Sequence, residues 1–428
     1  MLPDGPFLLY GAGREARSTR RFLKEMRPEA TVDVCVDNGS AEIEDARQVE
    51  INSLPAAYRD DAYAMVVRSP GVSLYKDEIT AAKDAGIPVT TNLNLWAEFR
   101  KAGALTIAIT GTKGKSTTAS LTHLMLDKSG IDAGLGGNIG VPPLELGDHD
   151  VIVLELSSFQ CADIAFTPDI IGITSLYPEH LDWHKTELAY YRDKLNLIPE
   201  DGDYRFAAGP QAALHPQIAA RHIPIGAQLP ALEPVFEDEI FDAIHASKLV
   251  GQHNLENAML AARLARAAGA TDEGILEGIA AFEPLPHRLE QHDIGGKKVV
   301  NDSIATTAHA SVAALDAFAA DRVALIIGGF DRGQDYSLLI DRIAANAPAL
   351  IIALPDTGAR IAGQIERAAP QATLLTAPDI DEALAMLAIR TEYFDTVLLS
   401  PGAPSFNQFA NYEERGRAFL DAARRHLG

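Results

Sequence analysis

The hydrophobic positions of the chain fall into two alternating patterns. Short apolar runs such as Phe7–Tyr10, Ala104–Ile109 and Val151–Leu154 are each followed by glycine or polar residues, as expected of buried strands. Stretches between them place apolar residues at helical spacing, for example Leu121 and Met125. Since strands alternate with helices, we predict an α/β fold with mostly parallel sheets. Its ligands should bind at the loops that follow the strands.

The first of these loops indicates a nucleotide-recognising turn. Gly11 and Gly13 follow the first strand, and about twenty residues further on Asp37 ends a second apolar run, placed to meet a ribose hydroxyl. A third run ends in a turn suited to a phosphate, at Ser69, Pro70 and Gly71. The residues alone leave four interpretations open: NAD, a UDP-linked substrate, a nucleotide fold that has lost its ligand, or a purely structural turn.

The loop after Ala104–Ile109 has the layout of a phosphate-binding P-loop. Its sequence, Thr110-Gly-Thr-Lys-Gly-Lys-Ser-Thr-Thr118, lies between a strand and a helix. The glycines let backbone N–H groups approach phosphates, Lys115 is placed to reach the β- and γ-phosphates, and the Ser116 hydroxyl to ligate Mg²⁺. Ile109 departs from the common pattern, which has glycine there. The alternative is a basic turn that caps an ordinary helix.

Two further loops of the central region carry candidate metal ligands. Glu155 follows a buried strand and is placed to be a second holder of nucleotide-bound Mg²⁺, the alternative being a helix cap. Residues 177–184 contain two histidines and two carboxylates at a spacing that matches no common zinc site, so we favour His180 as the single nitrogen ligand of a Mg²⁺ ion. Lys194 is unexpected in such a site unless it is modified.

The last third of the chain predicts a second substrate pocket. Strand-like runs at 298–300, 323–327 and 396–399 each enter a loop rich in glycine or polar residues, and such loops meet at one edge of a sheet. Turn chemistry would explain each loop taken singly. Before them, residues 284–288 have the composition of a linker, in which Arg288 is able to reach a γ-phosphate.

Two asparagines at the start of a predicted helix leave two interpretations open. Asn254 and Asn257 lie three residues apart, where an alanine-rich stretch begins. Their amides are suited to reading an adenine or a phosphate. The alternative is that Asn254 only caps the helix.

Size, charge and composition narrow the class of protein. A chain of 428 residues predicts two or three domains. With 37 Lys and Arg against 59 Asp and Glu, the net charge of −22 argues against non-specific binding to nucleic acid or to a membrane. Local cations must therefore gather any anionic substrate. No stretch is apolar enough for a membrane span, the N-terminus lacks a signal-peptide pattern, and two cysteines give no disulfide framework, so we expect a cytoplasmic protein.

With these motifs assembled, the whole chain resembles the Mur ligase family, the ATP-dependent amino-acid ligases of peptidoglycan synthesis. The motifs that carry the resemblance are Gly111–Thr117, Gly137–Gly140, Glu155–Gln160, Glu179–Asp182, His253 and Asn254 with Asn257, His287 and Arg288, Asn301–Ser303, and Ser400 with Pro401. The resemblance implies a Rossmann-like UDP-sugar-binding domain at 1–98, a central P-loop ATP-binding domain at 99–284, and a Rossmann-like amino-acid-binding domain at 285–428. It also implies ATP and Mg²⁺ as cofactors and a monomeric enzyme.

The resemblance further implies a role for each matching position. Lys115, His180 and Lys194 would be catalytic, with Lys194 carbamylated. The metal ligands would be Ser116, Glu155, His180 and the modified Lys194. The residues that bind ATP would be Gly111, Thr112, Lys113, Gly114, Lys115, Ser116, Thr117, Asn257, Arg288 and Asp302. Those that bind the UDP-sugar would be Gly11, Gly13, Asp37, Ser69, Pro70, Gly71, Asn138, Ser157 and Gln160. Those that bind glutamate would be Thr306, Arg332, Ser405 and Tyr412.

Three positions in the last third distinguish branches of this family. Relatives that add D-glutamate usually carry lysine and asparagine where this chain has Ile304 and Thr307, and lysine where it has Arg332. Since isoleucine cannot pair with a carboxylate, Arg332 is the best remaining group to hold glutamate. The combination resembles the branch that adds L-glutamate to UDP-N-acetylmuramoyl-L-alanine. The alternatives are the same reaction with D-glutamate, a folylpolyglutamate ligase, an NAD-dependent oxidoreductase, and a non-catalytic nucleotide-binding regulator.

Overall fold

The computed structural model describes residues 1–37, 39–60, 62–247, 249, 251–283, 286–406 and 408–428. The chain divides into two compact units, one made of Met1–Ala243 with Glu256–Ala281 and the other of Ile244–Leu255 with Phe282–Gly428. Among the described residues the first unit contains two sheets and the second unit one. The predicted α/β fold with three mostly parallel sheets is therefore confirmed, while the exact domain boundaries stay a prediction.

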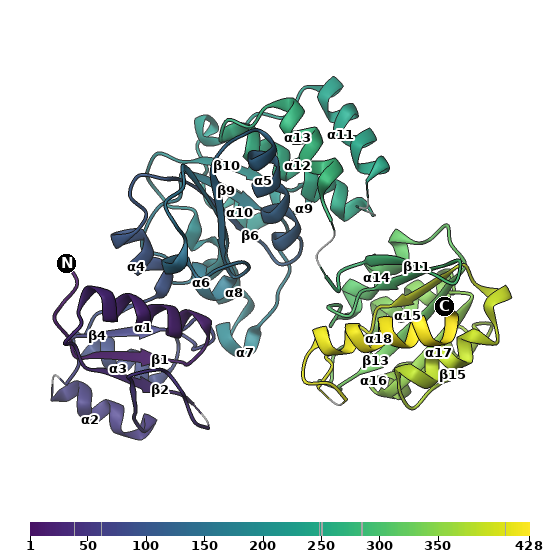
Figure 1. Ribbon diagram of the computed structural model, residues 1–428, viewed down its shortest axis with the longest axis horizontal. Coiled ribbons are helices and arrows are strands. Elements are labelled where there is room, and N and C mark those ends of the chain that lie inside the picture. The colour runs from purple at the N-terminus through teal and green to yellow at the C-terminus, as the bar shows by residue number, and fades with distance from the viewer. Residues whose placement is uncertain (38, 61, 248, 250, 284–285, 407) are drawn as a thin grey trace. The chain divides into compact units, whose positions relative to one another are not determined.

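The first sheet is parallel, with strand order β3-β2-β1-β4-β5. Phe7 and Leu9 of β1 pack toward α1, whereas Leu8 and Tyr10 pack toward α2 and α3, so the strand is buried on both faces. Figure 1 shows α1 on one side of this sheet and α2 with α3 on the other. The elements are β1 (Phe7–Tyr10), α1 (Arg14–Met26), β2 (Val32–Cys35), β3 (Arg47–Gln48), α2 (Leu54–Arg59), β4 (Met65–Arg68), α3 (Asp77–Asp84), β5 (Val89–Thr90) and α4 (Asn92–Phe99).

The second sheet is also parallel, with strand order β10-β9-β6-β8-β7. The P-loop strand β6 is central, so the loops that follow its neighbours β8 and β9 flank the P-loop. The elements are β6 (Leu105–Thr110), α5 (Lys115–Lys128), β7 (Ala133–Gly137), β8 (Val151–Glu155), α6 (Ser158–Cys161), β9 (Ile170–Ile173), α7 (Leu181–His184), α8 (Glu187–Lys194), β10 (Arg205–Ala208), α9 (Pro210–Ala213), α10 (Pro216–Ala219), α11 (Pro234–Ala246), α12 (Gln252–Ala267) and α13 (Asp272–Ala281).

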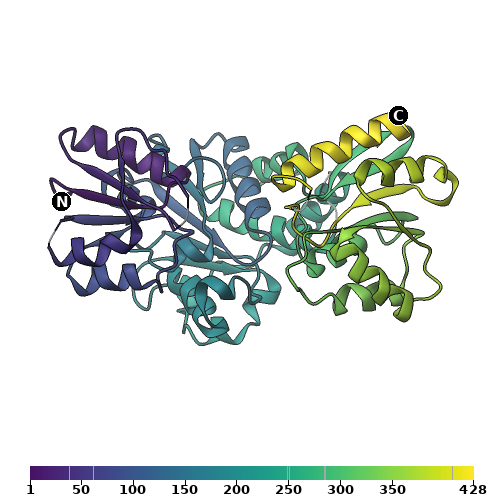
Figure 2. The ribbon, with the colours of Figure 1, turned by 90° about the horizontal axis from the view of Figure 1, so that it is seen from below.

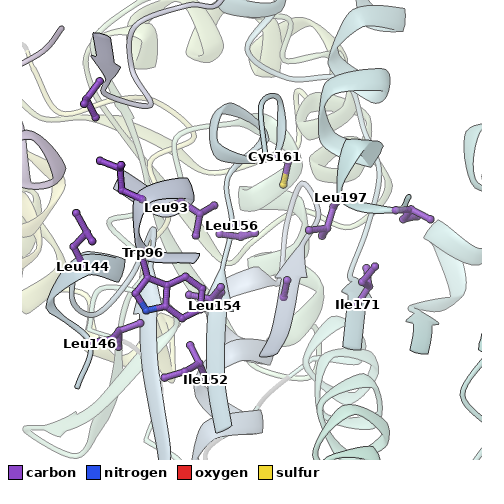
Figure 3. Close-up of a cluster of buried hydrophobic side chains, with 14 of the residues drawn as sticks. Leu93, Trp96, Leu144, Leu146, Ile152, Leu154, Leu156, Cys161, Ile171 and Leu197 are labelled. Carbon is purple, nitrogen blue, oxygen red and sulfur yellow. The ribbon is translucent and has the colours of Figure 1, made fainter. Parts of the chain in front are cut away.

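One hydrophobic core joins the first two sheets. Figure 3 shows Leu93 and Trp96 of α4 beside Leu144 and against Ile152 and Leu154 of β8. The Trp96 side chain is only 1% exposed, although it is among the largest in the chain. Because burial of apolar surface is the dominant favourable term in folding, this shared core explains why the two sheets form one compact unit.

The third sheet has strand order β11-β12-β16-β13-β14-β15, with β11 antiparallel to β12 and the other pairs parallel. Helices α17 and α18 cover one face, and α14, α15 and α16 the other; α18 is yellow in Figure 2. The elements are β11 (Glu290–Ile294), β12 (Lys297–Asn301), α14 (Ala308–Ala317), β13 (Val323–Gly329), α15 (Ser337–Ala345), β14 (Leu350–Asp356), α16 (Thr357–Ala368), β15 (Leu374–Thr376), α17 (Ile380–Ala388), β16 (Thr396–Leu399) and α18 (Tyr412–Leu427).

The three strands predicted to end at one edge, β12, β16 and β13, are direct neighbours in this sheet. Their loops therefore lie side by side, as expected of parallel strands. In the part of the chain that the structure describes, no helix combines the length and the apolar character needed to cross a membrane.

Candidate functional site

The P-loop geometry requires glycine at two positions. Gly111 and Gly114 have φ values of 145° and 88°, which disfavour any residue with a side chain. Gly114 directly precedes α5, and a Cβ atom there would collide with the side-chain amide of Asn257 on α12. The structure thus brings Asn257 against the predicted phosphate loop. These features favour a P-loop over the alternative of an ordinary helix cap.

Two lysines reach the backbone of this loop from different elements. Lys115 Nζ donates to the carbonyl of Thr112 at 3.0 Å, and Lys194 Nζ, from the end of α8, donates to the carbonyl of Gly111 at 2.7 Å. Burial, and then the charge of Lys115, lower the pKa of Lys194 to about 7. A large fraction of Lys194 is therefore a neutral, nucleophilic amine near neutral pH, which is what carbamylation by carbon dioxide requires.

Glu155 has the environment of a cation ligand. It is 1% exposed at the end of β8, and its Oε1 accepts a hydrogen bond from Asn138 Nδ2 at 2.7 Å. Its Oε2 is buried without any hydrogen-bond partner. A buried carboxylate oxygen is costly unless a donor or a cation faces it, so this atom fits a metal ion. The helix-cap alternative is wrong, because Ser157 is the residue that caps α6.

His180 also fits a metal ion. It directly precedes α7 in the left-handed region, with φ 56°, and its ring packs 4.9 Å from that of Phe159. Burial lowers the pKa of His180, which keeps the imidazole neutral and able to ligate a metal. Among the described residues no three His, Cys, Asp or Glu side chains converge. The predicted ligand set of Ser116, Glu155, His180 and a carbamylated Lys194 includes two groups other than His, Cys, Asp and Glu, and it stays a prediction.

A cavity of about 400 Å³ lies at the carboxyl edge of the first sheet. Gly11 is required there, because at φ 108° its Cβ would collide with Ser69. Asp37 accepts hydrogen bonds from Tyr10 and Lys76, both at 2.7 Å; although burial acts the other way, they keep the pKa of Asp37 below its usual value. The predicted UDP-sugar residues that line the cavity are Gly11, Gly13, Asp37, Ser69, Pro70, Gly71 and Asn138.

The other two predicted UDP-sugar residues form a helix cap beside this cavity. Ser157 and Gln160 make reciprocal hydrogen bonds at the start of α6, and Gln160 Nε2 also donates to Glu15 Oε1 at 2.7 Å. Glu15 lines the cavity and was not predicted. Burial raises its pKa to about 7.

Arg68 has a different role from the one that its position in the predicted phosphate turn suggests. Its guanidinium is fully buried and forms a two-bond ion pair with Asp163, at 3.1 and 2.7 Å. It also donates to the carbonyls of Ser69, Pro70 and Val72. Arg68 thus fixes the shape of the turn and leaves no charge free for a phosphate.

Sequence reasoning also missed a buried network behind His180. His184 Nδ1 lies 2.8 Å from Asp193 Oδ2, and its Nε2 lies 2.9 Å from the hydroxyl of Ser158. Tyr75, from the first sheet's side of the unit, donates to Asp193 at 2.7 Å. The second histidine of segment 177–184 was the available signal, but only the fold shows that it orients α6 and α7 instead of facing a ligand.

In the second unit, the loops after β12 and β16 meet around Asp302. Its carboxylate accepts hydrogen bonds from Ser400 Oγ at 2.8 Å and from the backbone of Leu289 at 3.3 Å. Burial raises the pKa of Asp302 to about 7, while the charge of Arg288 acts in the opposite direction. The Nε atom of Arg288 is buried without a hydrogen-bond partner. Two predicted ATP-binding residues therefore lie together here.

The predicted glutamate residues occupy the same edge. Ser405 is buried, and the Arg332 guanidinium lies 5.5 Å from the centre of the Phe406 ring. Gln334 donates to the carbonyl of Thr306 at 3.1 Å, and Tyr412 begins α18. Arg415, which was not predicted, donates from beneath these loops to both Ser303 and Ala403. No motif of the sequence analysis includes Arg415.

Two predictions near the boundary between the units have different outcomes. Helix α12 begins at Gln252, so Asn254 lies inside its first turn and the N-cap interpretation is wrong. The predicted linker at 284–288 lies partly outside the described residues, which omit 284 and 285. Along the chain, the predicted ATP-binding residues divide between the units, with Gly111–Thr117 and Asn257 in the first and Arg288 and Asp302 in the second.

Comparisons with known proteins show which family the chain is similar to. Residues 109–207 match the Mur ligase middle domain, and residues 287–402 match the Mur ligase, glutamate ligase domain. The UDP-N-acetylmuramoyl-L-alanine--L-glutamate ligase of Salinispora tropica is 34% identical over 98% of this chain and 97% of its own. The UDP-N-acetylmuramoylalanine--D-glutamate ligase of Lactococcus lactis is 30% identical over 98% of this chain and 97% of its own.

A solved structure shows the same fold at low sequence identity. The UDP-N-acetylmuramate-alanine ligase of Thermotoga maritima matches with a TM-score of 0.59 and 16% identity, covering 98% of this chain and 99% of its own. Together with the two domain matches and the near full-length relatives, the P-loop flanked by Glu155 and His180 identifies this chain as a member of the Mur ligase family.

Proposed function

We propose that the chain is an ATP-dependent ligase that joins L-glutamate to the L-alanine carboxylate of UDP-N-acetylmuramoyl-L-alanine, a step of peptidoglycan precursor synthesis. The observation that carries the proposal is the buried Lys194, whose Nζ lies 2.7 Å from the carbonyl of Gly111 in the phosphate loop. Together with the free oxygen of Glu155, it gives this P-loop the parts of a phosphoryl-transfer site. The name of the Salinispora tropica relative supports the choice of substrates.

The first half of the reaction is phosphoryl transfer. The alanine carboxylate attacks the γ-phosphorus of ATP, and the bond between that phosphorus and the β–γ bridging oxygen breaks. ADP is the leaving group, and the substrate becomes an acyl phosphate. Lys115 and the N–H groups of the loop at Gly111–Gly114 stabilise the charge that gathers on the phosphate oxygens. Ser116, Glu155, His180 and carbamylated Lys194 would hold Mg²⁺, which when bound neutralises further negative charge.

The second half is amide formation. The amine of glutamate, after losing a proton, attacks the acyl carbon, and inorganic phosphate leaves. Asn257, Arg288 and Asp302 would contact the nucleotide, while Asn138, Ser157 and Gln160 would contact the muramoyl part of the substrate. Along the chain, the P-loop residues belong to the first unit and Arg288 to the second.

The choice of L-glutamate rests on the third sheet. Ile304 offers no charge, and Asp331 is held by two hydrogen bonds from Arg360, at 2.9 and 2.8 Å, so it does not neutralise the adjacent Arg332. Arg332 is exposed beside Phe406 and is available to hold the side-chain carboxylate of glutamate with two parallel hydrogen bonds. Thr306, Ser405 and Tyr412 would complete the pocket. We further propose that the enzyme is a monomer and works in the cytoplasm.

The deciding experiment measures phosphate release with ATP, Mg²⁺ and UDP-N-acetylmuramoyl-L-alanine, with L- and D-glutamate supplied separately. We expect turnover with L-glutamate, and loss of turnover in Lys115→Ala. Preference for D-glutamate, the second candidate that the Lactococcus lactis relative represents, would overturn the assignment of the isomer. Absence of phosphate release with either isomer would overturn the ligase itself.

A further inference from the structure

The cavity at the carboxyl edge of the first sheet contains one cation that no predicted role accounts for. Arg14, the first residue of α1, lines this cavity beside the Gly11–Gly13 turn. Among the cavity-lining residues that the structure describes, it is the single basic side chain. A diphosphate bound in this cavity would therefore meet the Arg14 guanidinium first.

The other basic side chains at this edge are already neutralised. Lys76 forms an ion pair with Asp37 at 2.7 Å, and the Arg68 guanidinium is fully buried against Asp163. In a chain with a net charge of −22, an anionic ligand depends on basic side chains that are not already paired with a carboxylate. Of these three basic side chains, Arg14 is the one able to provide that charge.

The Arg14 side chain is held in place without losing its charge. It donates to the carbonyl of Gly140 at 3.1 Å and to that of Asn138 at 3.3 Å, both of them neutral acceptors. An arginine has five N–H donors, so these two hydrogen bonds leave others for a ligand. The same two bonds fix Arg14 across the cavity, between α1 and the Gly137–Gly140 loop that follows β7.

Glu15, which follows Arg14 in the sequence, carries a reduced negative charge. Glu15 also lines the cavity, but it accepts a hydrogen bond from Gln160, and burial raises its pKa to about 7. A partly protonated Glu15 opposes an incoming anion less than an ionised carboxylate does. The start of α1 adds a partial positive charge in the same place.

We propose that Arg14 is a substrate-binding residue that holds the diphosphate of the nucleoside-diphosphate sugar. This inference rests on the proposed function and adds a contact to it. The guanidinium would bind two phosphate oxygens side by side, in the geometry that arginine favours. Because uridine lacks phosphates, Arg14 should matter for UDP and not for the nucleoside.

The test compares binding of UDP and uridine to the full chain by calorimetry, with uridine measured in competition. In Arg14→Gln we expect UDP affinity to fall about 10- to 100-fold, in keeping with loss of a charge-assisted fork, while uridine affinity stays unchanged. Arg14→Lys should recover part of the loss, since it keeps the charge without the fork. The KM for the UDP-sugar should rise in Arg14→Gln, and the KM for ATP should not.

Arg17→Gln is the matched control, because Arg17 is exposed on the same helix and does not line the cavity. It should bind both compounds as the unmodified chain does. Equal losses of UDP and uridine in Arg14→Gln would mean that Arg14 only shapes the cavity, and unchanged UDP binding would mean that it plays no part; either result overturns the inference. If the unmodified chain itself bound neither UDP nor the UDP-sugar, the proposed function would fail with it.

Discussion

At the scale of single residues, the fold removes three ionisable side chains from water. Lys194, Asp302 and Glu15 all have a pKa near 7, and in each case burial is the first cause. Burial disfavours the charged form of a side chain. It therefore lowers the pKa of a lysine and raises the pKa of a carboxylic acid, so that both values approach 7. Such groups gain or lose a proton when a ligand or a modification arrives.

Lys194 provides the first prediction. We expect Lys194→Ala, and equally Lys194→Arg, to lose at least about 100-fold in kcat, because neither side chain can become a carbamate; mutational losses of this size are usual for metal-site residues. Carbon-13 NMR with labelled bicarbonate should show a carbamate signal in the unmodified chain and none in either variant. A full-rate Lys194→Arg enzyme would contradict carbamylation.

Glu15 provides a prediction about stability and pH. Between its unfolded pKa of 4.5 and its folded pKa of about 7, the unfolded chain is ionised at this position while the folded chain holds the proton. The contribution of Glu15 to the free energy of unfolding is therefore full below the lower value and is lost as pH rises through the upper one, by about 3 kcal/mol at most. The charged groups that act on it are Arg14, Arg68 and Asp163.

Urea unfolding of the unmodified chain and of Glu15→Gln at about pH 5 and about pH 8 measures this contribution. Taking the difference between the two proteins cancels other groups that titrate nearby, including Lys194, whose lowered pKa acts with the opposite sign. We expect the difference in stability between the two proteins to change with pH in the direction given above. A pH-independent difference would mean that Glu15 ionises normally.

At the scale of elements, the junction of β6 and α5 shows how a backbone requirement and a packing requirement coincide. Gly114 must have a positive φ to turn the strand into the helix, and its missing Cβ makes room for Asn257 of α12. A sequence motif reports the first requirement only. The second depends on a helix more than a hundred residues later in the chain.

This junction gives the third prediction. Gly114→Ala should cost about 1–2 kcal/mol of stability for its left-handed backbone conformation and, in addition, abolish tight ATP binding by displacing Asn257. Gly130→Ala is the matched control: Gly130 follows the other end of α5 at φ 75°, and nothing lies within 4 Å of its Cβ position. Calorimetric titration with a non-hydrolysable ATP analogue should show loss of binding in Gly114→Ala and retention in Gly130→Ala. Equal ATP binding by both variants would remove Asn257 from the site.

At the scale of the whole molecule, the first two sheets act as one body because polar and apolar contacts cross between them. The shared core around Trp96 supplies the apolar part. Arg68 supplies a polar part, since it joins the end of β4 to Asp163 and to the carbonyl of Phe159 in the central sheet's half of the unit. The predicted UDP-sugar cavity lies beside this junction, so its shape depends on both sheets.

The fourth prediction concerns this junction. Arg68→Met should lower the free energy of unfolding by about 3–5 kcal/mol, because it leaves Asp163 and several carbonyls without their donor in a buried place. Arg47→Met is the control, since Arg47 makes a similar two-bond pair with Asp33 within the first sheet. Arg47 is exposed, and the buried Asp33 keeps a second donor in the hydroxyl of Tyr63, at 2.7 Å. Urea unfolding should therefore show a clearly smaller loss of stability in Arg47→Met than in Arg68→Met. Comparable losses in the two variants would show that Arg68 does not hold the sheets together.

The sequence alone determined the local part of the site. Glycines at Gly111 and Gly114, the strand before them and the helix after them are constraints between near neighbours, so they are readable from the chain. The same holds for Glu155 at the end of its strand and for the order of the motifs. This is why the α/β fold and the family could be predicted before any contact was known.

Only the tertiary structure decided which charges remain available. Arg68 and Arg14 both lie at strand-to-turn patterns. The charge of Arg68 is neutralised by an ion pair with Asp163, whereas Arg14 donates only to neutral carbonyls in the described contacts. Glu15, His184 and Arg415 were not predicted as site residues, and each gains its role from a partner on another segment. Desolvation and ion pairing depend on what surrounds a side chain in space, and spacing along the chain does not contain that information.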